Sequence, residues 1–212
     1  MNLLSMGYSL PATRPGQIIG LLGGSFDPPH SGHVHISLEA IKRFGLDRLW
    51  WLPSPGNPLK EKGPAPLDAR IDAAKAIIDH PIVCISDIES KIGTIYTAQT
   101  LEALQSARPN VRFVWLMGAD NLAQFDQWQN WRDIMERVGL GVLARPGQQI
   151  SAQLSKTSRV YRAARIKGEA SGLLGHIKPP VWCFVNLPMT SISSTMLRNY
   201  GAWQSRAIPV SR

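Results

Sequence analysis

The sequence has few of the features that mark secreted, membrane-spanning or metal-clustered proteins. It contains 2 cysteines among 212 residues, Cys84 and Cys183, which are too far apart to form a metal-binding motif. Reduced thiols in a cytoplasmic protein are therefore expected. Residues 1–17 lack the basic start and the long apolar core of a signal peptide. No apolar run is long enough to span a membrane, and there is no repeat or low-complexity array.

Acidic residues are also scarce relative to basic ones. The sequence has 23 Lys and Arg against 15 Asp and Glu, a net charge of +8. This surplus favours anionic partners such as nucleotides, phosphates or nucleic acid. A hydrophobic content of 44% with 18% charged residues indicates a globular chain rather than a disordered one. We expect an N-terminal extension over residues 1–16, one domain over 17–200 and a tail over 201–212.

Short apolar runs alternate with amphipathic segments along the chain. The apolar runs predict strands at 18–22, 48–52, 82–85, 111–117, 138–143 and 181–185. The spacing of apolar residues predicts helices at 33–44, 67–79 and 98–107. In the second helix we expect Ile71, Ala74 and Ile77 on the inner face and Arg70 outside. The alternation predicts an α/β fold with a mostly parallel sheet flanked by helices.

A glycine-rich turn joins the first predicted strand to the first predicted helix. Residues 23–34 read Gly-Gly-Ser-Phe-Asp-Pro-Pro-His-Ser-Gly-His-Val. Gly23 and Gly24 can adopt positive φ and let the backbone approach a ligand, and a helix N-terminus suits phosphate. His30 and His33, three residues apart, are expected to face the same point. The alternative is a tight turn with two incidental histidines. Asp27 is expected to order the turn without being a ligand.

A second motif lies near the C-terminus, where residues 192–198 read Ile-Ser-Ser-Thr-Met-Leu-Arg. Hydroxyl side chains at a helix start cap the helix and bind phosphate oxygens. Arg198 follows Ser194 by one helical turn, so both can meet one phosphate group. A simple capping box is the alternative. We expect this motif and the two histidines to converge on a single triphosphate pocket.

Both motifs resemble those of one enzyme superfamily. Residues 23–33 are similar to the Gly-Gly-Ser-Phe-Asp-Pro-x-His-x-Gly-His motif of the bacterial nicotinate mononucleotide adenylyltransferases, which are His-x-Gly-His nucleotidylyltransferases. Residues 192–198 resemble the Ile-Ser-x-Thr-x-x-Arg motif of the same superfamily, and the motifs occur in the family order. The resemblance spans about residues 18–200 and implies a single Rossmann-like nucleotidyltransferase domain.

The resemblance also implies a reaction in NAD biosynthesis. Nicotinate mononucleotide and ATP, accompanied by Mg²⁺, would give deamido-NAD and pyrophosphate. The mononucleotide phosphate would attack the α-phosphorus of ATP in line, so the protein would need no nucleophile or metal site of its own. Catalysis would then consist of positioning and charge stabilisation.

The resemblance assigns roles to individual residues. The residues implied to be catalytic are His30, His33 and Arg198. Those implied to contact ATP are Gly24, Ser25, Phe26, Lys60, Gly118, Asp120, Ser193, Ser194 and Thr195. Those implied to contact nicotinate mononucleotide are Tyr96, Thr97, Trp128 and Arg145.

Several of these residues also have a structural interpretation. Thr97 is a plausible N-cap of the helix at 98–107, and Asp120 is a plausible N-cap for 121–125. Trp128 and Trp131 are at helical spacing, which is typical of core residues. Lys60 and Arg145 fit solvated surface positions.

Two other functions stay open from the sequence. One is another adenylyl- or cytidylyltransferase of the same superfamily, such as one that uses phosphopantetheine; the long turn motif, Tyr96, Thr97 and Trp128 argue against it. The other is a nucleic-acid-binding protein, suggested by the charge of +8 and the basic stretch at 156–167. No zinc-finger spacing or RRM motif supports it. We therefore expect small-molecule partners, without nucleic acid or membrane, and leave a homo-oligomer open.

Overall fold

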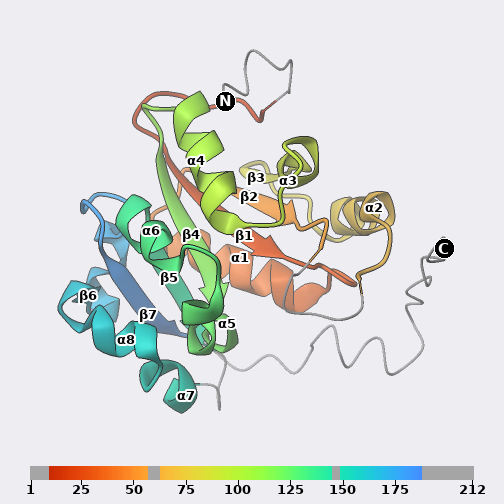
Figure 1. The fold of residues 1–212 in the computed structure, drawn as a ribbon. Coiled ribbons are helices and arrows are strands. Elements are labelled where there is room, and N and C mark those ends of the chain that lie inside the picture. Colours follow the sequence, from red (N-terminus) through yellow and green to blue (C-terminus); the bar gives the residue numbers. More distant parts are fainter. Residues whose placement is uncertain (1–9, 57–62, 145–148, 188–212) are drawn as a thin grey trace.

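The computed structural model describes residues 10–56, 63–144 and 149–187, and the structural statements below concern these residues. Within them the chain forms a seven-stranded sheet of order β3-β2-β1-β4-β5-β7-β6 (Figure 1). Every neighbouring pair of strands is parallel. The strands are β1 (Ile18–Gly24), β2 (Arg48–Pro53), β3 (Val83–Ile85), β4 (Arg112–Gly118), β5 (Gly139–Ala144), β6 (Arg165–Ile166) and β7 (Trp182–Asn186). The predicted α/β class is confirmed, and β6 was not predicted.

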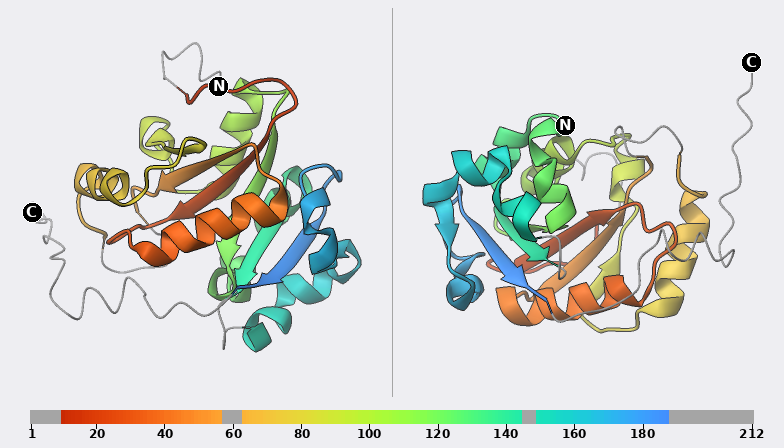
Figure 2. Two further views of the ribbon diagram at one scale, coloured as in Figure 1. Left: turned by 180° about the vertical axis from the view of Figure 1, so that it is seen from behind. Right: turned by 90° about the horizontal axis from the view of Figure 1, so that it is seen from below.

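Helices cover both faces of the sheet. They are α1 (Ser31–Phe44), α2 (Leu67–Ile77), α3 (Ile88–Lys91), α4 (Thr97–Ala107), α5 (Ala119–Ala123), α6 (Trp131–Arg137), α7 (Gln149–Gln153) and α8 (Lys156–Val160), with 3-10 turns η2 (Phe125–Gln127), η3 (Arg162–Ala164) and η4 (Gly168–Leu173). Figure 2 shows α1 and α2 on one face and α4 and α6 on the other. The sheet has a hydrophobic core on each face. Trp50 and Trp51, adjacent in β2, belong to different cores, because successive strand residues point to opposite faces.

The order of the strands places a topological switch point between β1 and β4. The chain leaves β1 through α1 on one face and reaches β4 through α4 on the other. In open parallel sheets, ligands bind beyond the carboxyl ends of the strands at such a switch point. Gly24 pairs with Pro53 of β2, and Leu22 pairs with Leu116 of β4, so β1, β2 and β4 end at the same edge. The glycine-rich turn follows β1 at this edge.

Helix α2 differs most from its prediction. Arg70 was expected outside, but its side chain is fully buried, whereas Ile77 was expected inside and is 39% exposed. Arg70 follows Leu67 by three residues and precedes Ala74 by four, so it lies on the inner stripe of the helix. A buried guanidinium is stable there because carbonyl oxygens surround it, as described below.

Two further local features differ from the sequence analysis. Residues 87–93, where no helix was predicted, contain the single-turn helix α3. Trp128 and Trp131 were expected on one helix, but Trp128 ends η2 and Trp131 begins α6. The intervening Asn130 has a left-handed φ of 53°, which separates the two segments. The two rings therefore occupy different environments.

Two contacts join the first described residues to this framework. Leu10 belongs to the same hydrophobic core as Leu101 of α4 and Ile134 of α6, and the N–H of Gly16 donates to Asn110 O over 2.6 Å. The division into an extension, a domain and a tail stays a prediction, since residues 188–212 lie outside the description. Cys84 and Cys183 are both free thiols. None of the helices found in the described ranges has the length and apolar character needed to cross a membrane.

Candidate active site

The glycines of the turn serve packing rather than an unusual backbone conformation. Gly23 and Gly24 lie in β1 and do not use the positive φ that glycine allows; Phe26 has a positive φ instead, of 46°. A Cβ at Gly23 would lie 2.5 Å from the Trp115 ring, so a side chain there would displace that ring. A Cβ at Gly24 would lie 3.4 Å from the Phe26 ring. Ser25 is partly exposed at this point.

His30 and His33 cap the N-terminus of α1 reciprocally. The Gly32 N–H donates to His30 Nδ1 over 3.0 Å, and the His30 N–H donates to His33 Nδ1 over 3.2 Å. These backbone donors are therefore used within the cap, and not free for phosphate as the sequence suggested. Because both Nδ1 atoms accept, the proton of each neutral ring resides on Nε2. The ring centroids are 3.9 Å apart, which confirms that the two imidazoles lie together.

The His33 ring is held from beneath by aromatic packing. Phe26 lies 4.7 Å from His33 and stacks on Trp51 at 4.8 Å, centroid to centroid. The Trp51 Nε1–H donates to Ser37 Oγ, and Ser37 in turn donates to the His33 carbonyl oxygen one helical turn earlier. The Phe26 side chain is itself buried. Only the backbone of Phe26 remains available to the ATP contact that the sequence assigned to it.

Arg70 and Asp27 join the turn to the segment that follows β2. The Arg70 guanidinium donates to three carbonyl oxygens: Ser25 at 2.6 Å, Ala65 at 2.7 Å and Ser54 at 2.9 Å. Asp27 Oδ1 accepts from the Ala65 N–H, as expected of a residue that orders the turn. Burial lowers the pKa of Arg70, and the Asp27 charge opposes that shift. Ala65 is thus held at both its backbone N–H and its carbonyl.

Gly118 and Asp120 form the other wall of the switch point. Asp120 was predicted as an N-cap, but Gly118 occupies that position and Asp120 lies one residue inside α5. The Asp120 carboxylate folds back over Gly118, where any Cβ would overlap it. Asp120 is exposed. Its carboxylate therefore stays accessible at the carboxyl end of β4, as a contact to a ribose hydroxyl requires.

Trp128 is a half-buried ring next to this wall. It makes edge contacts with Phe125 at 5.2 Å and with Trp115 at 6.3 Å. Trp115 in turn fills the space above Gly23, so one ring separates Trp128 from the glycine turn. Trp131, by contrast, is buried in the core. The prediction that Trp128 rather than Trp131 presents a surface to a ligand fits this difference in burial.

Tyr96 and Thr97 stand at the start of α4. Thr97 was predicted as its N-cap, but Tyr96 occupies that position without a side-chain cap, and Thr97 is the first helical residue. The preceding turn is instead fixed by Thr94, whose hydroxyl accepts from the Tyr96 N–H over 3.0 Å. Tyr96 and Thr97 are both partly exposed. The Thr97 hydroxyl is therefore not consumed by capping.

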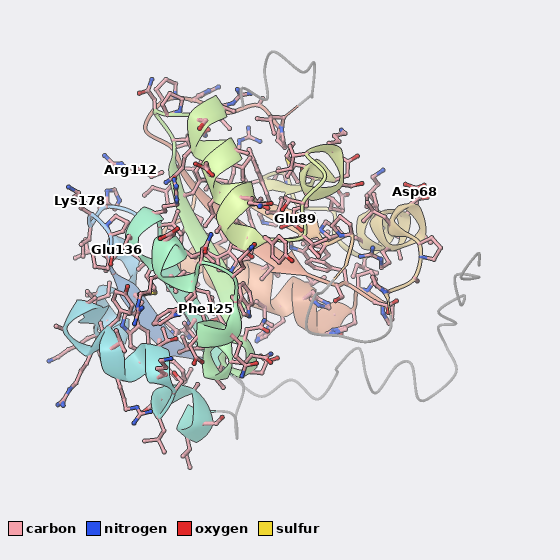
Figure 3. The ribbon with its side chains drawn as sticks, viewed as in Figure 1. Asp68, Glu89, Arg112, Phe125, Glu136 and Lys178 are labelled. Atoms are coloured by element: carbon pink, nitrogen blue, oxygen red, sulfur yellow. The ribbon has the colours of Figure 1, made fainter. Side chains whose placement is uncertain are left out.

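One buried acid near this helix start was not predicted. Glu89 in α3 is 4% exposed (labelled in Figure 3). Burial raises its pKa to about 7, and hydrogen bonds from Thr100 and Ser54 oppose that shift. The polar run Glu89-Ser90-Lys91 carries no periodicity that marks a buried position. The burial of Arg70, in contrast, could have been found from its spacing to Leu67 and Ala74.

The remaining predicted residues lie outside the described ranges. They are Lys60, Arg145, Ser193, Ser194, Thr195 and Arg198. The convergence of the C-terminal motif on the histidine pair therefore stays a prediction. Across the part of the chain that the structure describes, no group of three or more His, Cys, Asp or Glu is arranged to hold a metal ion.

Comparison with known proteins agrees with this arrangement. A family model described as cytidylyltransferase-like matches residues 21–200. A protein of Ruegeria pomeroyi named probable nicotinate-nucleotide adenylyltransferase is 58% identical over 200 residues, covering 94% of each chain. One of the same name from Roseobacter denitrificans is 59% identical over 198 residues, covering 93% of this chain and 100% of its own. The solved Plasmodium falciparum nicotinic acid mononucleotide adenylyltransferase complexed with NaAD matches with a TM-score of 0.66 at 18% identity, covering 87% of this chain and 83% of that one. This last likeness concerns the fold alone.

Proposed function

The chain belongs to the cytidylyltransferase-like family and, within it, to the nicotinate-nucleotide adenylyltransferases, and from this membership together with the site geometry we infer its reaction. The enzyme joins nicotinate mononucleotide and ATP to give deamido-NAD and pyrophosphate, a step of NAD biosynthesis. A phosphate oxygen of the mononucleotide attacks the α-phosphorus of ATP, and the bond from that phosphorus to the bridging oxygen of pyrophosphate breaks. The attacking oxygen is already ionised, so the protein supplies position and charge.

His30 and His33 supply donors at the reacting phosphates. With both Nδ1 atoms accepting from backbone N–H groups, each neutral ring carries its proton on Nε2. Two such donors, fixed by the cap and by the Phe26 and Trp51 rings, suit phosphate oxygens on which negative charge increases in the transition state. Their fixed orientation means that little reorganisation is needed during the reaction. We assign these two residues to catalysis and Arg198 to the same task.

The rest of the ATP site extends along the carboxyl edge of the sheet. Gly24, Ser25 and the Phe26 backbone would contact the nucleotide from β1, and Gly118 with Asp120 would contact the ribose from β4. Ser193, Ser194, Thr195 and Lys60 are assigned to the phosphates on the strength of the sequence motifs. Mg²⁺ that accompanies ATP would lower the charge of its phosphates. The residues present fit an ion held mainly by phosphate, since the two imidazoles offer N–H donors and such ions need few protein ligands.

The nicotinate mononucleotide would lie across the switch point, next to Trp128. The half-buried indole offers a face for the pyridine ring, and Tyr96 and Thr97 offer polar groups at the start of α4. Arg145 is assigned to an anionic group of this substrate. A cytoplasmic location fits the two free thiols, and small molecules are the expected partners.

The single observation that supports this function most directly is the reciprocal cap, which holds the two imidazoles 3.9 Å apart at the start of α1. The test measures pyrophosphate release from Mg·ATP with nicotinate mononucleotide, nicotinamide mononucleotide or phosphopantetheine offered separately. We expect release with the first to exceed the others, and loss of activity with EDTA that Mg²⁺ restores. Preferential turnover of phosphopantetheine would overturn the substrate assignment. Tight, salt-sensitive oligonucleotide binding without any transfer would overturn the enzyme assignment.

A further inference from the structure

Ser54 connects the two halves of the proposed site. Its N–H donates to the Gly24 carbonyl oxygen at the end of β1 over 2.9 Å, and its carbonyl oxygen accepts from Arg70. Its hydroxyl contacts both the Gly56 carbonyl oxygen and the Glu89 carboxyl. Ser54 therefore relates the histidine turn on one side to α3 and α4 on the other.

The Ser54 hydroxyl has one proton and two acceptors. When Glu89 is ionised, its carboxylate competes with the Gly56 carbonyl for that proton. When Glu89 is protonated, the carboxyl can donate to Ser54 Oγ, and the Ser54 hydroxyl then donates to Gly56. The protonation of Glu89 thus decides whether the chain at Gly56 is held. Gly56 also lies against Ile95, since a Cβ at Gly56 would stand 3.8 Å from Ile95 Cγ2.

The Thr100 hydroxyl also has one proton and two possible acceptors. It lies 3.2 Å from Glu89 Oε1 and 3.3 Å from the Tyr96 carbonyl oxygen, and it has one proton to donate. The Tyr96 carbonyl oxygen also accepts from the backbone N–H groups of Gln99 and Thr100, each at 3.1 Å. Ionised Glu89 draws the hydroxyl proton of Thr100 away from Tyr96, and protonated Glu89 lets this hydroxyl add a further hydrogen bond there. One buried carboxyl therefore acts on Gly56 and, through this additional contact, on Tyr96. Tyr96 and Thr97 are the residues assigned to the mononucleotide.

We propose that Glu89 is a positioning residue whose proton sets how firmly the Ser54 and Thr100 hydroxyls hold Gly56 and Tyr96, and thereby how tightly the mononucleotide binds. This inference rests on the proposed function. In this proposal Glu89 does not contact substrate. Binding is tight when Glu89 is protonated and weakens as Glu89 ionises. The ATP side changes less, because Arg70 holds Ser25 and Ser54 in both states.

Among the described residues, burial and the Ser54 and Thr100 hydroxyls set the pKa of Glu89, and charged neighbours do not. On α3, Asp87 and Lys91 pair with each other at the surface over 2.9 Å. On α4, Glu102 faces Arg137 at 3.5 Å. Beyond β2, Arg70 directs its guanidinium to carbonyl oxygens. Among the described groups, none contributes a charge to the shift of Glu89, and its pKa of about 7 lies within the working range of the experiment.

The test compares wild type, Glu89→Gln and the control Glu102→Gln in steady-state kinetics from pH 5.5 to 9. Gln stays uncharged, so it copies the protonated state. As pH rises through about 7, we expect KM for nicotinate mononucleotide to rise about fivefold in wild type and Glu102→Gln relative to Glu89→Gln, which corresponds to a lost hydrogen bond of ordinary strength. KM for ATP should change less than about twofold. Titration of the substrate phosphate is common to all three and cancels.

An equal pH step in wild type and Glu89→Gln would overturn the proposal, and so would a step of the same size in KM for ATP. If wild type releases no pyrophosphate with the mononucleotide, the proposed function fails. The positioning role of Glu89 is then tested by amide hydrogen exchange instead of by kinetics. Exchange at the amides of Ser54, Gly56 and residues 96–100, corrected for intrinsic rates, should quicken above pH 7 in wild type and Glu102→Gln but not in Glu89→Gln. Identical exchange profiles in all three proteins would overturn the proposal on that route.

Discussion

Replacing Arg70 tests whether a buried guanidinium holds the catalytic turn in place. Arg70→Met keeps most of the side-chain volume and removes all three donors. The Ser25, Ala65 and Ser54 carbonyl oxygens, now 2.6, 2.7 and 2.9 Å from the guanidinium, lose those hydrogen bonds. Each buried carbonyl left without a partner costs about 1–3 kcal/mol, and part of this is offset because the guanidinium itself is no longer desolvated. We expect a net loss of about 3–5 kcal/mol in the free energy of unfolding.

Urea unfolding monitored by circular dichroism measures this loss. With a slope of about 2–3 kcal/mol per molar urea for a domain of this size, the midpoint should fall by about 1–2 M. Arg70→Lys keeps the charge but not the forked donors, so its urea midpoint should fall by roughly half as much as that of Arg70→Met. The control is Lys75→Met on the same helix, where the exposed amine lies 3.7 Å from Asp72. Exposed pairs of this kind contribute about 0–1 kcal/mol.

Kinetics of the folded fraction complete the test, because a displaced turn should also lower kcat. An Arg70→Met midpoint equal to that of Lys75→Met would show that the three carbonyls find water or other donors without cost. Normal kcat in a destabilised variant would show that Arg70 stabilises the fold without positioning the histidines. Either result would refute the reasoning that the guanidinium sets the geometry of the turn.

Four other outcomes follow from the same structure. Gly23→Ala should destabilise the fold by about 1–3 kcal/mol through overpacking against a rigid indole, whereas Gly63→Ala, with nothing near its Cβ, should change urea midpoints little. His33→Ala should lower kcat by about 100-fold or more through loss of a transition-state donor, and wild-type turnover in a folded variant would remove it from the mechanism. Trp128→Ala should raise KM for the mononucleotide and leave KM for ATP unchanged; the opposite pattern would exclude stacking. The pKa of Glu89 is about 7 in the folded protein, above the ordinary value of 4.5, so Glu89 ionises first in the unfolded chain as pH rises. The free energy of unfolding of wild type should therefore fall by roughly 3 kcal/mol between about pH 4.5 and 7. Urea titrations across that range should show no such fall for Glu89→Gln.

The strands β1, β2, β4, β5 and β7 were predictable because they are buried on both faces and read as continuous apolar runs. The edge strand β6 has two residues, neither of them buried, and so gave no such run. Local polar detail was less predictable. Thr97 missed the N-cap position by one residue and Asp120 by two. At α4 the N–H of Tyr96 is satisfied by the neighbouring Thr94 hydroxyl and not by a cap residue. Arg70 was placed outside because charge was weighed above helical spacing. Glu89 had no signal at all, since its burial depends on α3, α4 and the end of β2 meeting in space.

The histidine pair shows why structural and chemical roles in such a motif need not compete. Capping alone does not call for imidazole, because Ser, Asp or Asn accept a backbone N–H at least as well. Those side chains, however, end at the accepting atom. An imidazole that accepts at Nδ1 carries a proton on the far side of a rigid ring, at Nε2, and so converts a backbone hydrogen bond into an oriented donor. Folding of the first turn of α1 thereby fixes the Nδ1 partners of both rings, and one short segment of sequence can begin a helix and also provide the oriented donors that the proposed phosphate site requires.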